Sequence, residues 1–206
     1  MLDYPIRDRR AERRASTRAE ILEAAWELCR AEGLAGLSLR DLARRVGMQA
    51  PSLYSYFASK GAIYDAMFAQ GCQEFVDGQQ DIRPTGDLLA DLKAGLRYFV
   101  EFCTKSEVRY QLLFQRTIPG FEPSPESFAI SAANLAEIAD WFVSSGLGGQ
   151  ESVDLFTAIG TGLADQQISN DPGGDRWLRL LDDAAEMFFN HVQARTTKPK
   201  PRKRRV

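Results

Sequence analysis

Apolar residues recur at intervals of three and four positions along almost the whole chain, which is the spacing of one face of an α-helix. No segment alternates apolar and polar residues as a half-buried strand does. The sequence therefore predicts an all-α protein with about nine helices. These helices are expected at about residues 17–32, 39–46, 47–57, 59–78, 88–103, 107–117, 125–144, 152–169 and 175–194.

Start and stop signals support the first of these helices. Thr17 with Glu20 fits a capping box, in which the side chain of each residue accepts a hydrogen bond from the backbone N–H of the other. Gly33 is a residue at which a helix commonly ends. Ser38 with Asp41 makes a second capping box. We also expect a break at residues 78–87, where the turn formers of GQQDIRPTGD gather.

The charge is unevenly distributed, although its sum is only −2. Basic residues outnumber acidic ones in residues 1–60 and again in 198–206, whereas residues 61–197 are strongly acidic. This pattern confines any binding to a polyanion to the two ends, and it equally fits a solvated surface with a flexible tail. We expect a basic flexible arm at 1–16, a DNA-binding domain at 17–64, a helical domain at 65–197 and a disordered basic tail at 198–206.

Several classes of function find no support in the residues. The three cysteines, Cys29, Cys72 and Cys103, are odd in number and lie in helical patterns, which indicates buried free thiols. The only histidine, His191, has Phe188 rather than Glu three positions before it, and no phosphate loop or nucleophile elbow occurs. No signal peptide or 18-residue apolar run is found. We therefore expect a cytoplasmic protein that is not an enzyme and has no metal, cofactor or membrane partner.

Two short helical segments follow one another at 39–46 and 47–57. The second begins with the tight turn Gly47-Met48-Gln49, which joins the two helices. A pair of short helices with so brief a connection is a helix-turn-helix, in which the first helix braces the second against a nucleic-acid groove. Ala43 is small where the two helices should cross, and Gly47 can adopt the left-handed conformation that ends a helix.

The second helix of this pair has an apolar edge and a polar face. At 100° per residue, Leu53 and Phe57 share the edge that should be buried, and Tyr54 and Tyr56 flank it. The opposite face carries Pro51, Ser52 and Ser55. This layout suits a helix in a major groove, with small groups at the floor and hydroxyls near the phosphates. Taken singly, the tyrosines also suit the rim of an ordinary helical hairpin.

The stretch LSLRDLARRVGMQAPSLYSYFASKGAIYDAM resembles the N-terminal DNA-binding domain of TetR-family transcriptional regulators, over about residues 17–68. The shared pattern is a Gly turn, a small residue and Pro, then Ser-Leu-Tyr, an aromatic pair and Lys. The resemblance implies a homodimer that binds a palindromic double-stranded DNA operator, usually as a repressor. It also implies a C-terminal domain in which a small molecule weakens DNA binding.

The resemblance also assigns roles to single positions. The residues placed to read bases are Arg40, Ala50, Pro51, Ser52 and Ser55. The residues placed near backbone phosphates are Tyr54, Tyr56 and Lys60, with Ser38 beside them. Gln49 stands where family members often carry Ser, so the second helix either begins without a side-chain cap or uses Gln49 to read a base. Gly61 replaces an often acidic residue.

In the C-terminal part the resemblance implies an effector pocket and a dimer interface. A hydrophobic or aromatic effector would contact Phe99, Cys103, Tyr110, Phe114, Asn134, Trp141 and Phe142. The last two helices would pair across a two-fold axis through Ile159, Gly160, Leu163, Trp177, Leu181 and Phe188. The alternative for both sets is an intramolecular core.

Two further alternatives stay open. The arginines of the leader, Arg7, Arg9, Arg10, Arg13 and Arg14, fit an arm in an adjacent minor groove or a solvated leader, and the tail PRKRRV is equally ambiguous. The rival to a DNA-binding regulator is a helical ligand-binding or protein-interaction module whose DNA-binding element is vestigial.

Overall fold

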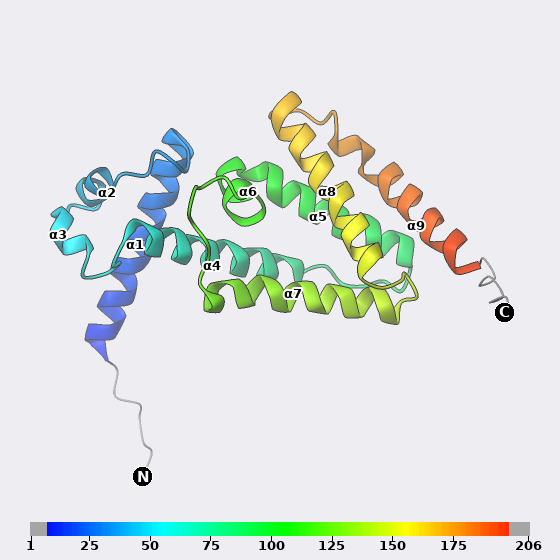
Figure 1. Ribbon diagram of the computed structural model, residues 1–206, viewed down its shortest axis with the longest axis horizontal. Coiled ribbons are helices and arrows are strands. Elements are labelled where there is room, and N and C mark those ends of the chain that lie inside the picture. The colour runs from blue at the N-terminus through cyan, green and yellow to red at the C-terminus, as the bar shows by residue number, and fades with distance from the viewer. Residues whose placement is uncertain (1–7, 198–206) are drawn as a thin grey trace, which may run out of the picture. The chain divides into compact units, whose positions relative to one another are not determined.

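The computed structural model describes residues 8–197, and the regular elements in that range are all helices, with no strand. The all-α prediction is therefore confirmed. The elements are α1 (Arg9–Glu32), α2 (Leu39–Arg45), α3 (Ala50–Leu53), α4 (Lys60–Gln79), α5 (Leu88–Lys105), α6 (Glu107–Phe114), α7 (Pro125–Ser144), α8 (Gln150–Asn170), the 3-10 turn η1 (Leu178–Leu180) and α9 (Leu181–Thr197) (Figure 1). The predicted tail at 198–206 and the first seven residues of the predicted arm lie outside the described range. None of the helices in residues 8–197 has the length and apolar content of a membrane span.

The chain divides into two compact units. The N-terminal unit comprises residues 1–72 and 111–128, and the C-terminal unit comprises residues 73–110 and 129–206. The boundary falls inside α4, between Cys72 and Gln73, so one helix belongs to both units. The segment that links α6 to α7 belongs with the N-terminal helices rather than with its neighbours in sequence.

Helix α1 begins eight residues earlier than the sequence indicated. The carboxylate of Asp8 accepts hydrogen bonds from the backbone N–H groups of Arg10 (3.0 Å) and Ala11 (3.1 Å), which caps the helix there. The prediction of a flexible arm up to residue 16 is therefore wrong for residues 9–16. Gly33 ends the helix with φ of 74°, as predicted.

The core of the N-terminal unit is built from apolar side chains of α1, α2, α3 and α4. Its most deeply buried side chains include Ile21, Trp26, Leu42, Leu53, Ile63 and Met67. The indole N–H of Trp26 donates to Gln70 (3.0 Å), and the hydroxyl of Tyr64 donates to the carbonyl oxygen of Leu34. These two buried polar groups thus have partners, which limits the cost of their burial.

All three cysteines are free and buried, as predicted. Burial raises the pKa of Cys29 and Cys72 to about 11 and that of Cys103 to about 12. Because the thiolate is the reactive form, these residues act as small apolar side chains at neutral pH.

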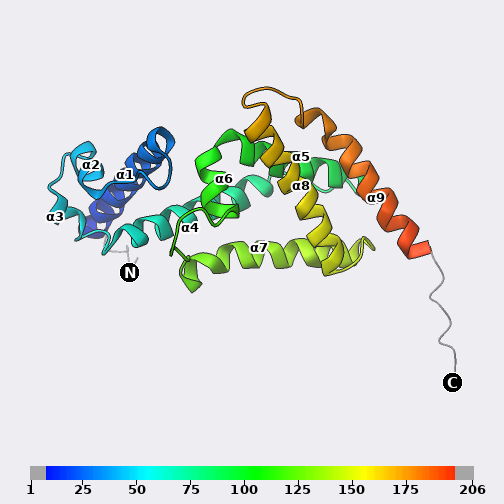
Figure 2. The same cartoon turned by 45° about the horizontal axis from the view of Figure 1, so that its top comes forward.

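Helices α8 and α9 both pack on α5 in the C-terminal unit, and the three run beside one another in both ribbon views (Figure 2). One buried cluster comprises Leu96, Val100, Cys103, Tyr110, Ala164, Leu181 and Ala185. A second comprises Leu92, Phe142, Leu147, Val153, Phe188 and Val192. Exposed ion pairs between Arg97 and Asp182 (2.8 Å) and between Arg195 and Glu151 (2.7 Å) add little beside this burial.

Three residues predicted for the dimer interface belong to this intramolecular core instead. Leu181 and Phe188 are 0% and 1% exposed. Gly160 faces α5 so closely that a Cβ atom there would lie 2.9 Å from Cδ1 of Phe99. The predicted roles of Gly160, Leu181 and Phe188 between subunits are therefore wrong, because the inward faces of α8 and α9 are already covered.

Helix α9 also starts later than predicted, at Leu181 rather than near Asp175. The side chain of Gln167 accepts a hydrogen bond from the backbone N–H of Trp177 (2.8 Å), and the carboxylate of Asp171 accepts one from Arg176 (2.9 Å). Side chains thus satisfy these two amide groups, and the N–H groups of Arg179 and Leu180 donate to the carbonyl oxygens of Asp175 (3.0 Å) and Trp177 (3.2 Å) in the turn that leads into α9.

Two glycines in helix interiors provide a test of this packing. Gly95 in α5 has no atom within 4 Å of a would-be Cβ, whereas Gly160 in α8 has a phenylalanine ring there. We expect Gly95→Ala to raise the free energy of unfolding by about 0.5–1 kcal/mol. Gly160→Ala should lower it by about 1 kcal/mol, because overpacking outweighs the gain in helix propensity. Urea denaturation of both variants measures the difference, and a stabilised Gly160→Ala would contradict the packing.

Candidate nucleic-acid interface

The turn between α2 and α3 has the geometry of a helix C-cap. Gly47 has φ of 68°, and its N–H donates to the carbonyl oxygen of Arg44 (3.2 Å). The N–H of Met48 donates to the carbonyl oxygen of Ala43 (2.8 Å). This pair of bonds is a Schellman motif, which stops α2 and redirects the chain. The predicted roles of Gly47 and of Ala43, which is 2% exposed, are confirmed.

Helix α3 is shorter than the sequence indicated. Only residues Ala50–Leu53 are α-helical, and residues 54–56 form a turn, so the prediction of a helix through Phe57 is wrong. The N–H groups of Tyr56 (2.9 Å) and Phe57 (3.0 Å) both donate to the carbonyl oxygen of Leu53. Leu53 and Phe57 are nevertheless 1% and 3% exposed, as the predicted apolar edge requires.

The predicted recognition face is open to solvent. Side chains at this surface belong to Arg40, Gln49, Pro51, Ser52, Tyr54 and Ser55, and those of Ala50 and Tyr56 are half-buried. Gln49 makes no capping hydrogen bond, so α3 begins without a side-chain cap. Ser38, in contrast, caps α2 by accepting from the N–H of Asp41 (3.3 Å). The structure thus places the small and polar positions of α3 on one accessible face.

The three arginines on α2 differ in whether their side chains form ion pairs. Arg44 pairs with Asp41 (2.8 Å), and Arg45 pairs with Glu27 (2.7 Å). Arg40 is exposed and forms no hydrogen bond or ion pair within residues 8–197. Its guanidinium group therefore keeps all its donors for an external acceptor.

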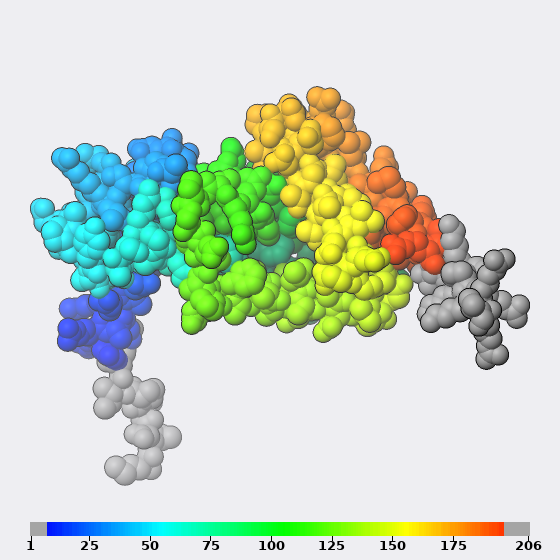
Figure 3. Space-filling model, in the orientation of Figure 1, coloured from blue at the N-terminus to red at the C-terminus, as the bar shows by residue number. Residues whose placement is uncertain are grey.

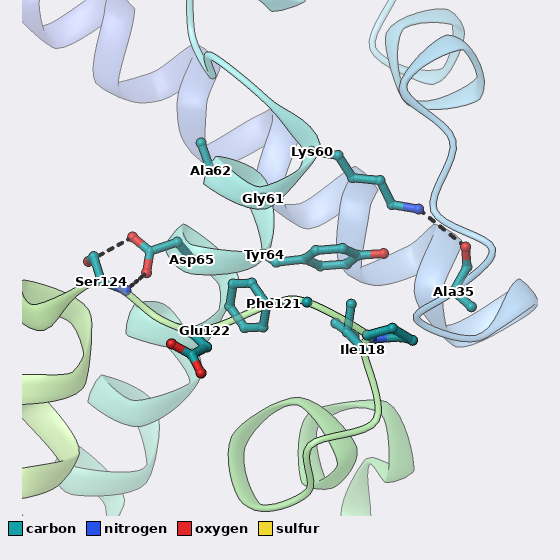
Figure 4. Close-up of a pocket in the computed structure, with 12 residues that line it drawn as sticks. Ala35, Lys60, Gly61, Ala62, Tyr64, Asp65, Ile118, Phe121, Glu122 and Ser124 are labelled. Carbon is teal, nitrogen blue, oxygen red and sulfur yellow. Dashed lines mark hydrogen bonds between the residues drawn. The ribbon is translucent and has the colours of Figure 1, made fainter.

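Lys60 lies at the start of α4, where its ammonium group donates to the carbonyl oxygen of Ala35 (3.2 Å). The same nitrogen lies 5.4 Å from the centre of the Tyr64 ring (Figure 4). The side chain is half-buried and borders an open groove of about 640 Å³. A lysine ammonium has three donors, so a contact with a phosphate stays a prediction beside the bond to Ala35.

The segment between α6 and α7 forms the other wall of this groove, and sequence reasoning did not anticipate its anchor. The carboxylate of Asp65 in α4 accepts from the N–H (2.6 Å) and hydroxyl (3.0 Å) of Ser124 (Figure 4). It also accepts from the hydroxyl of Ser127 (2.9 Å). The Phe121 ring packs edge-on against Tyr64, with ring centres 5.6 Å apart. The one signal in the sequence is Ser124-Pro125, a typical helix start.

Sequence reasoning also missed Arg18, and it placed Arg14 in a flexible arm. Both guanidinium groups contact the turn after α3: that of Arg14 donates to the carbonyl oxygen of Ser55 (2.6 Å), and that of Arg18 to the carbonyl oxygen of Tyr56. The available signal was the four-residue spacing of these arginines, which places them on one face of a helix.

The seven residues predicted to contact an effector do not share one environment. Cys103 and Tyr110 are buried in one core cluster and Phe142 in the other, so these three are core residues. Phe99 and Trp141 are half-buried at the margins of those clusters. Asn134 on α7 is also half-buried. Phe114 is 39% exposed and belongs to the N-terminal unit. The alternative of an intramolecular core holds for the three buried residues.

Comparison with known proteins supports the interpretation of the N-terminal unit. Residues 21–67 match the family model described as bacterial regulatory proteins, tetR family. The HTH-type transcriptional activator FasR of Mycolicibacterium smegmatis is 31% identical over 50% of this chain and 47% of its own length. The chain thus spans about half the length of that relative, and 66% of the length of several mycobacterial regulators.

Two further proteins match most of the chain. The putative mycofactocin biosynthesis transcriptional regulator MftR of Mycobacterium tuberculosis is 27% identical over 92% of this chain and 96% of its own length. The structure of FadR from Bacillus subtilis, solved in complex with stearoyl-CoA, has a TM-score of 0.67 at 15% identity. That match covers 83% of this chain and 97% of FadR, and it shows a shared fold. Through residues 21–67, which contain the helix-turn-helix, the chain thus matches the tetR family of bacterial regulatory proteins, and most of its length shares the fold of FadR.

Proposed function

We propose that the protein is a cytoplasmic transcriptional regulator that binds double-stranded operator DNA as a homodimer. Binding of an apolar effector would release it from that DNA. The observation that carries this proposal is the exposed face of α2 and α3, on which Arg40 keeps an unpaired guanidinium group beside small and polar side chains. Repression is the proposed mode, because a dimer seated on an operator at a promoter excludes other proteins from it. The same residues offer no support for catalysis.

The proposed DNA contacts fall into two kinds. Arg40, Gln49, Ser52 and Ser55 present donors and acceptors toward base edges, whereas Tyr54 and Lys60 reach toward phosphates. The 54% exposure of Tyr54 supports its role, because a hydroxyl-tipped ring so far from the core has no packing duty. An exposed arginine without a partner on this surface favours DNA binding over a vestigial element.

We expect Arg40→Ala to reduce the preference for operator over random DNA. A bidentate contact between arginine and guanine contributes about 1–3 kcal/mol of discrimination, or about 5- to 150-fold. Lys60→Ala should instead weaken binding to both DNAs and lower the log–log salt slope by about 0.9. Fluorescence anisotropy at two salt concentrations measures both effects.

The matched control is Arg44→Ala, which removes an equal charge from the same helix. Because Arg44 is paired with Asp41, its loss should leave the operator preference within about two-fold of the wild type. Equal losses on both DNAs for Arg40→Ala would show that α2 does not lie against the bases.

The proposed dimer interface is the outer face of α8 and α9, since their inner faces are buried on α5. Both helices reach the surface of their unit (Figure 3). Exposed apolar positions recur there: Leu155, Ala158 and Gly162 on α8, Leu180 at the end of η1, and Met187 and Ala194 on α9. Gly162 has open space where a Cβ would lie, which allows a second helix to approach closely. The half-buried Ile159, Leu163 and Trp177 remain candidates at its margin.

Met187→Asp should convert the dimer to a monomer. Burying a carboxylate in an apolar two-fold interface costs several kcal/mol, and the symmetry repeats the damage on both subunits. Light scattering should then report a mass near 23.0 kDa instead of about twice that value. Val143→Asp on α7 is the matched control, because Val143 and Met187 are both 63% exposed. Loss of the dimer in both variants, or in neither, would contradict the assignment to α8 and α9.

The proposed effector is a molecule with a long apolar chain. Helix α7 leaves Leu135 and Val143 exposed, at 45% and 63%, so it has apolar surface that its own unit does not cover. FadR, which shares the fold, was solved with stearoyl-CoA. A ligand shifts an equilibrium only through different affinities for the two states, so the response needs a link from α7 to the DNA-binding helices.

That proposed link is the set of hydrogen bonds between Asp65 and the first turn of α7. Because Asp65 lies on α4 close to Lys60, a movement of Ser124 and Ser127 would pull directly on the start of that helix. The bonds involve a charged acceptor, and such bonds contribute about 1.5–3 kcal/mol each.

Asp65→Ala should therefore separate ligand binding from DNA release. Stearoyl-CoA should still raise the melting temperature of the variant, as ligand binding to the folded state does, but should release at least about tenfold less operator DNA than from the wild type. Ser127→Ala, which removes one bond of three, should give an intermediate response. If stearoyl-CoA fails to raise the melting temperature of the wild type, the proposed class of effector is wrong.

A further inference from the structure

Two arginines of α1 hold the turn that follows α3. Arg14 and Arg18 are four residues apart, so they project from the same side of α1. Arg14 donates to the carbonyl oxygen of Ser55, and its guanidinium carbon lies 5.1 Å from the centre of the Tyr56 ring. Arg18 donates to the carbonyl oxygen of Tyr56, and its guanidinium carbon lies 4.1 Å from the centre of the Phe57 ring. Each arginine thus makes one hydrogen bond and one cation–π contact.

The turn needs such support because α3 is too short to be stable by itself. A four-residue helix is far below the length at which an isolated helix is marginally stable in water. Its N-terminus has no side-chain cap, since Gln49 makes no capping bond. Beyond Leu53 the chain leaves the helix, and the carbonyl oxygens of Ser55 and Tyr56 find their partners in the two guanidinium groups rather than in a further helical turn.

We propose that Arg14 and Arg18 are positioning residues for DNA recognition, which orient the α3 face without contacting a base. The inference rests on the proposed DNA-binding function. Each guanidinium group stabilises the negative end of the short helix and its following turn. Arg18 is half-buried against Phe57, so its charge and its donors are directed to the protein.

The neighbouring arginines of α1 make a useful contrast. Arg9, Arg10 and Arg13 are exposed, and their side chains make no hydrogen bond or ion pair in the part of the chain that the structure describes. A general electrostatic attraction to DNA would depend on all five arginines alike. Positioning depends on Arg14 and Arg18 alone, and for this reason Arg13→Met is a control that loses the same charge without touching the turn.

The experiment compares full-length Arg18→Met, Arg18→Lys and Arg13→Met with the wild type. The first measurement is hydrogen exchange of the backbone amides in residues 53–57 of the free protein. The second is affinity for random DNA and for an operator that the wild type selects from a random library, at two salt concentrations. Circular dichroism verifies the fold, and Arg14→Met replaces Arg18→Met if the latter does not fold.

We expect Arg18→Met to accelerate exchange in residues 53–57 and to lower the operator preference, each by about tenfold, the effect of losing one charge-assisted hydrogen bond. Arg18→Lys keeps the charge but not the planar guanidinium group, so it should retain only part of the wild-type exchange protection and of the operator preference. The salt slope of Arg18→Met should equal that of the wild type. Arg13→Met should change neither exchange nor preference.

Two results would overturn the inference. If Arg18→Met matches Arg13→Met in exchange and preference, the contacts do not position the turn. If instead it weakens binding to both DNAs equally and lowers the salt slope by about 0.9, Arg18 is a phosphate contact. A wild type that selects no sequence from the library would contradict the proposed function, and the exchange measurement would still decide whether the two arginines hold the turn.

Discussion

The arrangement of the N-terminal unit depends on the burial of two side chains, Leu53 and Phe57, on either side of one short turn. They are 1% and 3% exposed, and complete burial of such side chains contributes about 1.5–3 kcal/mol each. No four-residue helix has comparable stability of its own. The polar face of α3 therefore points outward because its apolar edge is held inward, while the Schellman turn at Gly47 and the bonds from Arg14 and Arg18 hold the chain before and after it.

The C-terminal unit also depends on the burial of apolar side chains, and α5 is the helix against which α8 and α9 pack. Helices α8 and α9 cover it with their broader apolar faces, and Gly160 brings α8 to within contact of the Phe99 ring. Once those faces are buried, the smaller and less continuous apolar stripe that includes Gly162 and Met187 is left at the surface. A helix with apolar residues on two sides can thus serve the core and a partner at once.

Helix α4 and the segment that leads into α7 are joined by hydrogen bonds within the N-terminal unit. The boundary between the units falls within α4, and the carboxylate of Asp65 bonds the first residues of α7 to the N-terminal part of that helix. A carboxylate with three hydrogen bonds is a strong local anchor, because each bond is charge-assisted. In the proposed response to an effector, this anchor is the link between the start of α7 and α4.

The sequence by itself determined the all-α class, most of the helices, the Gly47 turn and the buried edge of the recognition element. These features depend on periodicity and on glycine conformation, which are local properties. Only the tertiary structure decided which of two apolar faces is inward on α8 and α9, and thus that Leu181 and Phe188 are core residues. Tertiary contacts also decided that α3 ends at Leu53 and that Arg18 lies against Phe57. The local sequence pattern cannot predict these features, because they depend on which residue, distant in the sequence, bonds a given carbonyl oxygen or covers a given apolar face.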